Sequence, residues 1–176
     1  MAVAAIFISL LALIIATYDT YAKRKHYSLS SRPLLNLNKE SDSSGKVILY
    51  ELVNKGLGSA IIKKIVIICG NETYENPSSS QFYEIIKTSG YKFANTTIDA
   101  LYSGVGIVSG EKIQIIRLAE ISNIKKSIDD IYKPFNHITL NINYESIYEE
   151  KFKLIENLGE PEQLNKLPPT NRKFNN

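Results

Sequence analysis

Cysteine, histidine and tryptophan are scarce in this chain of 176 residues, which has one Cys, two His and no Trp. The single cysteine, Cys69, excludes an internal disulfide and fits a reducing compartment. His26 and His137 lie far apart, and no His-x-x-x-His or paired-cysteine spacing indicates a metal site. No nucleophile, base and orienting group lie at a spacing typical of an active site. We therefore expect a non-enzymatic protein with no catalytic residue, no cofactor and no metal.

Three weaker patterns keep an enzyme as a minor alternative. The Gly56-Leu57-Gly58 loop could cradle a phosphate, but it lacks a third glycine and a following helix, so a tight turn that needs positive φ is the preferred interpretation. Cys69 could act as a nucleophile only with a base such as His137 beside it. The doublets Asp129-Asp130 and Glu149-Glu150 are typical of solvated surface. An active site would require these groups to converge in a cleft.

Charged side chains are absent from the chain before Asp19. The apolar run Ala2–Thr17, extended by Tyr18, is close to the lower limit of about 17 residues that can cross a hydrocarbon core. Its Val, Ile, Leu and Phe residues favour insertion by on the order of 3–5 kcal/mol. No basic residue precedes the run, and Thr17–Tyr21 is a poor cleavage site, which argues against a signal peptide. A buried core helix would need a helical domain around it. The sequence therefore predicts an uncleaved transmembrane anchor over residues 1–22.

The residues that follow the run predict contact with lipid headgroups. Tyr18 and Tyr21 lie where aromatic side chains prefer the membrane interface, and Lys23, Arg24 and Lys25 come directly after them. Basic residues flank only this end of the run, so the positive-inside rule predicts the N-terminus outside and the C-terminal domain in the cytoplasm.

The remaining chain divides by composition. Residues 23–32 form a basic juxtamembrane connector, 33–157 are enough for one domain, and the Pro-containing polar stretch 158–176 is expected to be a disordered tail. The net charge of +3 is modest, and much of the excess lies beside the membrane. This placement suits anionic headgroups and argues against a nucleic-acid-binding face.

Short runs of alternating apolar residues, separated by turn clusters, predict strands. These runs are Leu34–Asn38, Lys46–Asn54, Ile61–Cys69, Glu111–Leu118, His137–Tyr144 and Lys151–Ile155. A short helix is expected where Phe82, Ile85 and Ile86 follow capping serines, with Gly90 in the C′ role, and a second helix over Ile121–Tyr132. We therefore predict a mainly β fold: an antiparallel β-sandwich, immunoglobulin-like in architecture, with one or two short inserted helices.

Tyrosines near the last predicted hairpin allow two interpretations. Tyr132, Tyr144 and Tyr148 could form an exposed patch that binds a partner, since tyrosine is favoured at interfaces. They could equally cover the core at a hairpin corner, which is the preferred interpretation. The sequence does not show whether the rings are exposed.

Three segments carry a resemblance to known proteins: Leu29–Leu37, Leu52–Ala60 and Tyr144–Tyr148. Together with the anchor, they resemble a group of small, uncharacterised bacterial single-pass membrane-anchored proteins. The Asn54–Ala60 loop is also similar to loops between strands in immunoglobulin-like adhesion-type modules. The resemblance implies the fold and an anchor in the bacterial inner membrane, and it transfers no catalytic residue.

These observations predict a non-enzymatic, membrane-tethered interaction module whose β-sandwich binds another protein at the cytoplasmic face of the inner membrane. The alternative is an accessory subunit of a membrane complex, for example of a defence-type system, whose anchor packs on other helices. Ala5-x-x-x-Ser9 and Ala12-x-x-x-Ala16 have the small-residue spacing for such packing. The sequence does not indicate the partner, the biological process or the oligomeric state.

Overall fold

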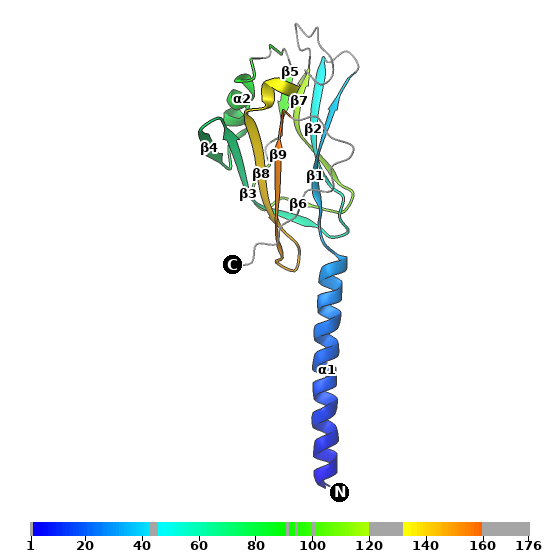
Figure 1. Ribbon diagram of the computed structural model, residues 1–176. Coiled ribbons are helices and arrows are strands. Elements are labelled where there is room, and N and C mark those ends of the chain that lie inside the picture. The colour runs from blue at the N-terminus through cyan, green and yellow to red at the C-terminus, as the bar shows by residue number, and fades with distance from the viewer. Residues whose placement is uncertain are drawn as a thin grey trace.

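The computed structural model describes residues 2–42, 46–90, 92–93, 95–99, 101–119 and 132–159, with side chains from residue 6 onward. It consists of one long N-terminal helix followed by a domain of two antiparallel sheets (Figure 1). The helix predicted over Ile121–Tyr132, the Asp129-Asp130 doublet and residues 160–176 of the predicted tail lie outside the described residues, apart from Tyr132.

Helix α1 (Ala2–Ser30) is longer than the predicted anchor. The segment expected to form a connector continues the helix up to Ser30, because no Gly or Pro interrupts it. Pro33 stops the helix, since it forces Arg32 out of helical backbone space. At 1.5 Å per residue, the helix is roughly 43 Å long, about the thickness of a bilayer with its headgroups. The span Ile6–Ser30 is long and apolar enough to cross a membrane, and none of it is buried against the domain.

The domain contains two sheets in which every pair of neighbouring strands is antiparallel. The first sheet has the order β1 (Leu35–Ser41), β2 (Val47–Asn54), β7 (Lys112–Ala119) and β5 (Asn95–Ile98). The second has the order β4 (Glu72–Glu75), β3 (Ala60–Cys69), β8 (Ile138–Glu145) and β9 (Lys151–Asn157), with β6 (Gly106–Ile107) also paired to β3. The predicted mainly β, antiparallel fold is confirmed.

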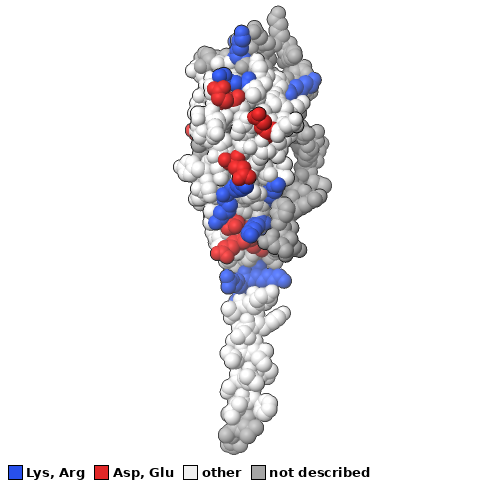
Figure 2. All heavy atoms as spheres, turned by 90° about the vertical axis from the view of Figure 1, so that its left-hand side faces the viewer, with Lys and Arg blue, Asp and Glu red and all other residues white. Residues whose placement is uncertain are grey.

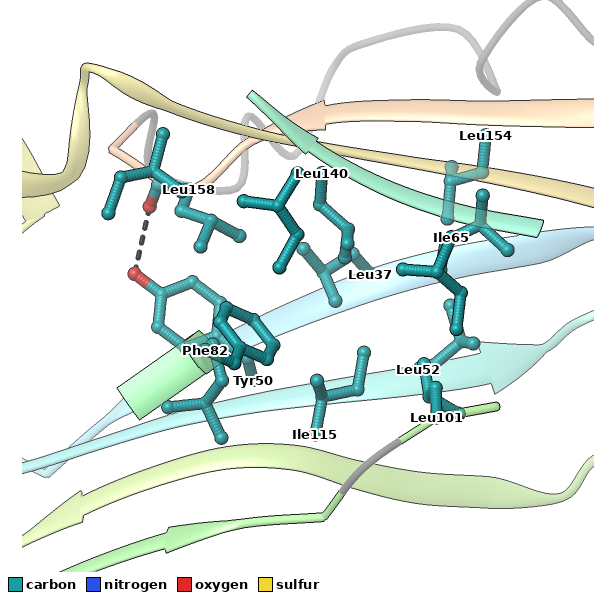
Figure 3. Packing of buried hydrophobic residues seen from close by; sticks show 14 of the residues in the cluster. Leu37, Tyr50, Leu52, Ile65, Phe82, Leu101, Ile115, Leu140, Leu154 and Leu158 are labelled. Carbon is teal, nitrogen blue, oxygen red and sulfur yellow. Dashed lines mark hydrogen bonds between the residues drawn. The ribbon is translucent and has the colours of Figure 1, made fainter. Parts of the chain in front are cut away.

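The two sheets enclose one hydrophobic core (Figure 3). Every second residue of β8 is buried, as the alternation of that segment predicts. From the first sheet, Tyr50 enters the core and its hydroxyl donates to the Leu158 carbonyl oxygen at 2.8 Å. Leu158 is fully buried. The domain therefore extends at least one residue beyond the boundary expected at 157.

Strict alternation fails where the strands contain bulges. The pairing of β2 with β7 shifts register between Tyr50 and Glu51, and the extra residue lets the neighbours Ile115 and Ile116 both enter the core. A second shift, between Ile62 and Lys64 of β3, changes which residues of that strand face inward. These bulges explain why buried and exposed residues do not alternate strictly along β3 and β7.

Helix α2 (Ser79–Lys87) forms where the sequence predicts it. Ser78 caps it in a capping box with Gln81, and Phe82, Ile85 and Ile86 are its buried residues. Thr88 is the C-cap, so Gly90, at φ +76°, lies one residue beyond the predicted C′ position. The helix covers the end of the domain opposite α1 (Figure 1), and the 3-10 helix η1 (Lys133–Phe135) contributes Phe135 to the core.

Candidate functional site

Many hydrogen bonds join the segments at the place where α1 meets the domain. Here the connecting backbone Ser31–Leu34 lies between two loops: the β2–β3 loop, Lys55–Ser59, and the β8–β9 turn, Ser146–Glu150. We call these three segments, together with Asn54, the junction.

Asn54, the last residue of β2, is the centre of the junction and is fully buried. Its Oδ1 accepts hydrogen bonds from the backbone N–H groups of Leu34 (3.1 Å) and Gly56 (3.0 Å). Its Nδ2 donates to the carbonyl oxygens of Gly58 (2.7 Å) and Ile107 (2.9 Å). The amide thus uses both donors and both acceptor positions of its oxygen, so its burial leaves no unmet polar group.

Backbone hydrogen bonds join the same loop to the connecting segment. The Lys55 N–H donates to the Leu34 carbonyl at 2.8 Å, and the N–H groups of Leu57 and Gly58 both donate to the Arg32 carbonyl, at 3.1 and 3.4 Å. Because these donors are already engaged within the chain, the loop offers no free cradle of N–H groups to a phosphate. The geometry gives no support to the phosphate-binding alternative for this loop.

Gly56 and Gly58 are required because the loop backbone lies very close to the backbone of Ser31 and Arg32, and not because their φ angles are positive. Neither is among the residues of positive φ, so the predicted reason for these glycines is wrong. A Cβ on Gly56 would lie 2.4 Å from the Arg32 carbonyl oxygen, and one on Gly58 would lie 1.7 Å from that of Ser31. The loop backbone can lie against the end of α1 only because both side chains are absent.

Within the junction, the β8–β9 turn also contacts the connecting segment Ser31–Leu34. The Arg32 guanidinium contacts the Glu150 carboxylate through two hydrogen bonds, Nε to Oε2 at 3.1 Å and Nη2 to Oε1 at 3.3 Å. The buried Ser146 hydroxyl oxygen accepts from the N–H groups of Tyr148 (3.2 Å) and Glu150 (3.3 Å), which shapes the turn.

Tyr144 adds a buried contact to the start of β1. Its hydroxyl oxygen accepts a hydrogen bond from the Leu35 N–H at 3.3 Å. Burial of the ring and hydroxyl raises the pKa of Tyr144 to about 12, and the Leu35 hydrogen bond opposes this only in part. The hydroxyl is therefore neutral at physiological pH and serves as structural support.

The predicted headgroup residues lie on α1, away from the domain contacts. Tyr18 and Tyr21 are exposed, and Lys23 pairs with Asp19 one turn earlier at 2.7 Å. On the face shown in Figure 2, the helix is uncharged along most of its length, and basic residues gather where it nears the domain. Arg24 and Lys25 are likewise exposed. The structure groups these five residues on one short stretch of helix.

The predicted tyrosine patch is not a surface for two of its three members. Tyr132 and Tyr144 are 3% and 1% exposed, and the hypothesis that they form an exposed patch is wrong. Tyr144 shares the inward face of β8 and stacks on Phe152, with ring centroids 5.4 Å apart, while Tyr132 packs edge-on against Tyr50. Tyr148 is half-buried in the turn.

Cys69 and His137 are brought close together by the antiparallel pairing of β3 with β8, with Thr88 between them. The Thr88 hydroxyl lies 2.8 Å from His137 Nε2 and 3.7 Å from Cys69 Sγ, and it donates to the Ile85 carbonyl at 2.6 Å. A nucleophilic cysteine needs its base in direct hydrogen-bond contact, and here a threonine intervenes. Within the described ranges, no group of three or more His, Cys, Asp and Glu side chains is arranged to hold a metal ion.

Comparison with known proteins adds no functional residue. No protein-family model matches the chain, and no curated protein matches it either.

The loop after Asn54 is distinctive in the sequence, but the role of Asn54 itself is apparent only in the structure. The available signal is an asparagine at the end of an apolar strand, two residues before Gly-x-Gly, because a buried amide needs several partners. Those partners include Leu34, which is 20 residues earlier, and the sequence pattern does not reveal that pairing.

Proposed function

We propose that this chain is a non-enzymatic, membrane-tethered interaction module. Its α1 helix crosses the bacterial inner membrane with the N-terminus outside, and its immunoglobulin-like β-sandwich binds another protein at the cytoplasmic face. The observation that carries the proposal is the direct connection of an unburied apolar helix to a β domain through the hydrogen bonds of Asn54 and Arg32.

The junction supports presentation in a defined direction. A flexible linker would let the domain sample many orientations, whereas the contacts of Ser31–Leu34 with two loops hold the domain against the end of α1. Tethering also raises the effective concentration of the domain toward a partner in the same membrane. A surface of modest affinity is then sufficient for binding.

The anchor is tested by the double substitution Leu11→Arg/Ile14→Arg in the full chain. Each arginine at the centre of a span costs about 2.5–3.5 kcal/mol, so the two together cost about 5–7 kcal/mol, which outweighs the total of on the order of 3–5 kcal/mol that favours insertion. We expect the variant to be lost from the membrane fraction. Alkaline or salt extraction should release any of it that remains there. The matched control, Tyr102→Arg/Ile155→Arg, adds the same charge at exposed positions of the domain and stays in the membrane fraction.

The orientation is tested by a reporter that is active only in the cytoplasm, fused after Asn176. Activity supports the N-out topology. Silence from a stably produced fusion overturns it, and a reporter that is active only outside the cytoplasm would then give the opposite result.

The interaction itself is tested by affinity capture from detergent-solubilised membranes after cross-linking, with a tag at the C-terminus. A protein that cross-links to the wild-type chain and to the Tyr102→Arg/Ile155→Arg control, but far less to Leu11→Arg/Ile14→Arg, supports a tether-dependent partner. Equal recovery with the detached variant contradicts the role of the anchor in binding.

A second function, accessory subunit of a membrane complex, is favoured by the span Ile6–Ser30, none of which is buried against the domain. Ala12 and Ala16 lie on one helix face, where a neighbouring helix can approach closely. Under this alternative, Ala12→Leu/Ala16→Leu abolishes the complex while the chain remains inserted. A lone anchor tolerates the same change, which makes the two functions distinguishable.

A further inference from the structure

The end of the domain from which α1 leaves has two turns with exposed aliphatic tips. Leu57, in the β2–β3 loop, is 78% exposed, and Ile147, in the β8–β9 turn, is 58% exposed. Both turns lie at the α1 end of the sandwich in Figure 1. Single exposed aliphatic residues are common on protein surfaces, so their placement needs further support.

Both tips are held in place by the same residue. The Leu57 N–H donates to the Arg32 carbonyl, and the Arg32 side chain pairs with Glu150 in the turn that carries Ile147. Leu57 is also fixed between Gly56 and Gly58, whose backbones lie against the end of α1. Hydrogen bonds and an ion pair therefore join both turns that carry these side chains to Arg32, just beyond the end of the helix.

Two lysines and an apolar groove lie near these tips, together with the exposed Glu149 and with Glu150, which is paired with Arg32. Lys55 precedes the Leu57 tip, and Lys151 follows the β8–β9 turn; both are exposed. Beside them is an open groove of about 380 Å³, whose apolar lining includes Leu29, Leu34 and Leu57. Exposed aliphatic side chains beside lysines suit the membrane interface, where the aliphatic groups meet the acyl chains and the lysines meet the phosphates.

The length of α1 brings this end of the domain close to the headgroups. A span of about 20 residues from Ala2 ends near Tyr21, and the nine residues on to Ser30 add roughly 13 Å. The headgroup layer occupies about 5–8 Å of that distance. The remaining gap is roughly 5–8 Å, and a typical tilt of about 20° lowers one side of the domain by about a third of its lateral distance from the helix. A tilted anchor therefore brings one side of the domain into contact with the surface.

We propose that this end of the domain docks on the bilayer that holds its own anchor. Leu57 and Ile147 enter the headgroup region, and Lys55 and Lys151 contact lipid phosphates. The inference rests on the proposed anchoring of α1, and it assigns a second, peripheral membrane contact to the β domain. Docking would fix the tilt of the domain and leave its opposite end, with α2, directed toward the cytoplasm.

The lack of tryptophan in the chain makes the test direct. Single-tryptophan variants of the full chain are placed in nanodiscs of phosphatidylcholine and phosphatidylglycerol. For the domain variants the quencher is bromine on the acyl carbons nearest the headgroup, and for the anchor variant it is bromine near the ends of the acyl chains, at the depth expected for Leu11. Leu57→Trp and Ile147→Trp report on the two tips. Tyr83→Trp, on α2 at the far end of the domain, is the control for quenching without contact, and Leu11→Trp reports on insertion of the anchor.

We expect Leu57→Trp and Ile147→Trp to have blue-shifted emission and to lose most of it in brominated nanodiscs, while Tyr83→Trp is unaffected. Adding Lys55→Glu/Lys151→Glu should restore much of the emission at position 57. If Leu11→Trp is quenched but neither tip is, the docking proposal is wrong and the anchor stands. If Leu11→Trp is not quenched, the anchor proposal fails, and the docking proposal fails with it.

Discussion

Gly58 and Ser31 approach so closely that a Cβ built on the glycine would lie 1.7 Å from the Ser31 carbonyl oxygen. One residue belongs to the loop after β2, and the other is the first residue beyond α1. This approach lets the Gly58 N–H reach the Arg32 carbonyl and lets the Gly58 carbonyl accept from Asn54. The attachment of the helix to the domain therefore depends on the absence of a side chain at Gly58, as it does at Gly56.

Gly58→Ala should weaken both the domain and its attachment to α1. The added methyl meets backbone atoms, which cannot rotate away, so we expect the free energy of unfolding to fall by about 2–3 kcal/mol. Urea unfolding of the full chain in detergent, followed by circular dichroism, measures this loss. Hydrogen exchange should also show reduced protection of the Leu57 and Gly58 amides.

The matched control for this substitution is Gly106→Ala. Gly106 has no positive φ, and a Cβ there would meet nothing within 4 Å. We expect a change of less than about 0.5 kcal/mol, typical of an exposed site. Equal destabilisation by both variants would mean that close contact with Ser31 is not the reason for the glycine.

Asn54→Ala should be the most destabilising single substitution in the junction. It leaves two backbone N–H groups and two carbonyl oxygens without the partner that Asn54 provides, in a buried site. Unsatisfied buried groups cost about 1–3 kcal/mol each, and relaxation with entry of water recovers part of this, so we expect a loss of at least about 3 kcal/mol. Equilibrium unfolding measures it.

Asn143→Ala is the comparison for Asn54→Ala. Asn143 is in β8 on the outward face and is only half-buried. We expect it to change the free energy of unfolding by less than about 1 kcal/mol. Similar losses in the two variants would show that the buried hydrogen bonds of Asn54 contribute little net stability.

The contrast between Asn54 and β8 shows what the sequence could predict. The alternation of Ile138, Leu140, Ile142 and Tyr144 depends on the two-residue period of a strand, which is local. It indicates that the four share one face, and in the structure that face is buried. Helix α2 was predictable for the same reason, since its capping box and apolar spacing lie within nine residues. Local rules are sufficient for such elements.

The features that the sequence did not reveal depend on distant pairs. The bulge that buries both Ile115 and Ile116 is defined by the register against Tyr50, more than 60 residues earlier. The contacts of the junction join residues near position 32 to residues near 56 and 150. Burial of Tyr144 against a start of β1 that lies 109 residues away likewise has no local signature. The residues of α1 that are expected at the lipid headgroups could therefore be named from the sequence. The contacts that form the junction could not.

The Arg32–Glu150 pair should show measurable coupling in a double-mutant cycle. Two parallel hydrogen bonds and partial burial place it above an ordinary surface ion pair, so we expect about 1 kcal/mol of coupling between Arg32→Ala and Glu150→Ala. Added salt should reduce it. The single contact between Lys112 and Glu51 at 3.4 Å is the reference, with a smaller expected coupling. Equal values for the two pairs would contradict a special role for Arg32.

Tyr144 should make the stability of the domain depend on pH above 10. Its pKa is raised from 10.0 to about 12 in the folded chain, so the folded state holds the phenolic proton more tightly than the unfolded state. The stabilisation is fully present below pH 10 and is lost as the pH rises through about 12. The shift corresponds to about 2–3 kcal/mol. Urea unfolding at intervals from pH 8 to 11 should show the onset of this loss.

Tyr144→Phe separates this effect from general alkaline unfolding. The variant loses the hydrogen bond from the Leu35 N–H, so at pH 8 we expect it to be less stable by about 1 kcal/mol. Its stability should then fall less steeply than that of the wild type above pH 10, because the buried ionisable group is gone. Tyr74→Phe is the control, since the pKa of Tyr74 is raised mainly by its hydrogen bond to Glu72 at an exposed site. If Tyr144→Phe keeps the full alkaline slope while Tyr74→Phe loses it, the hydroxyl beside Leu35 is not the group that titrates.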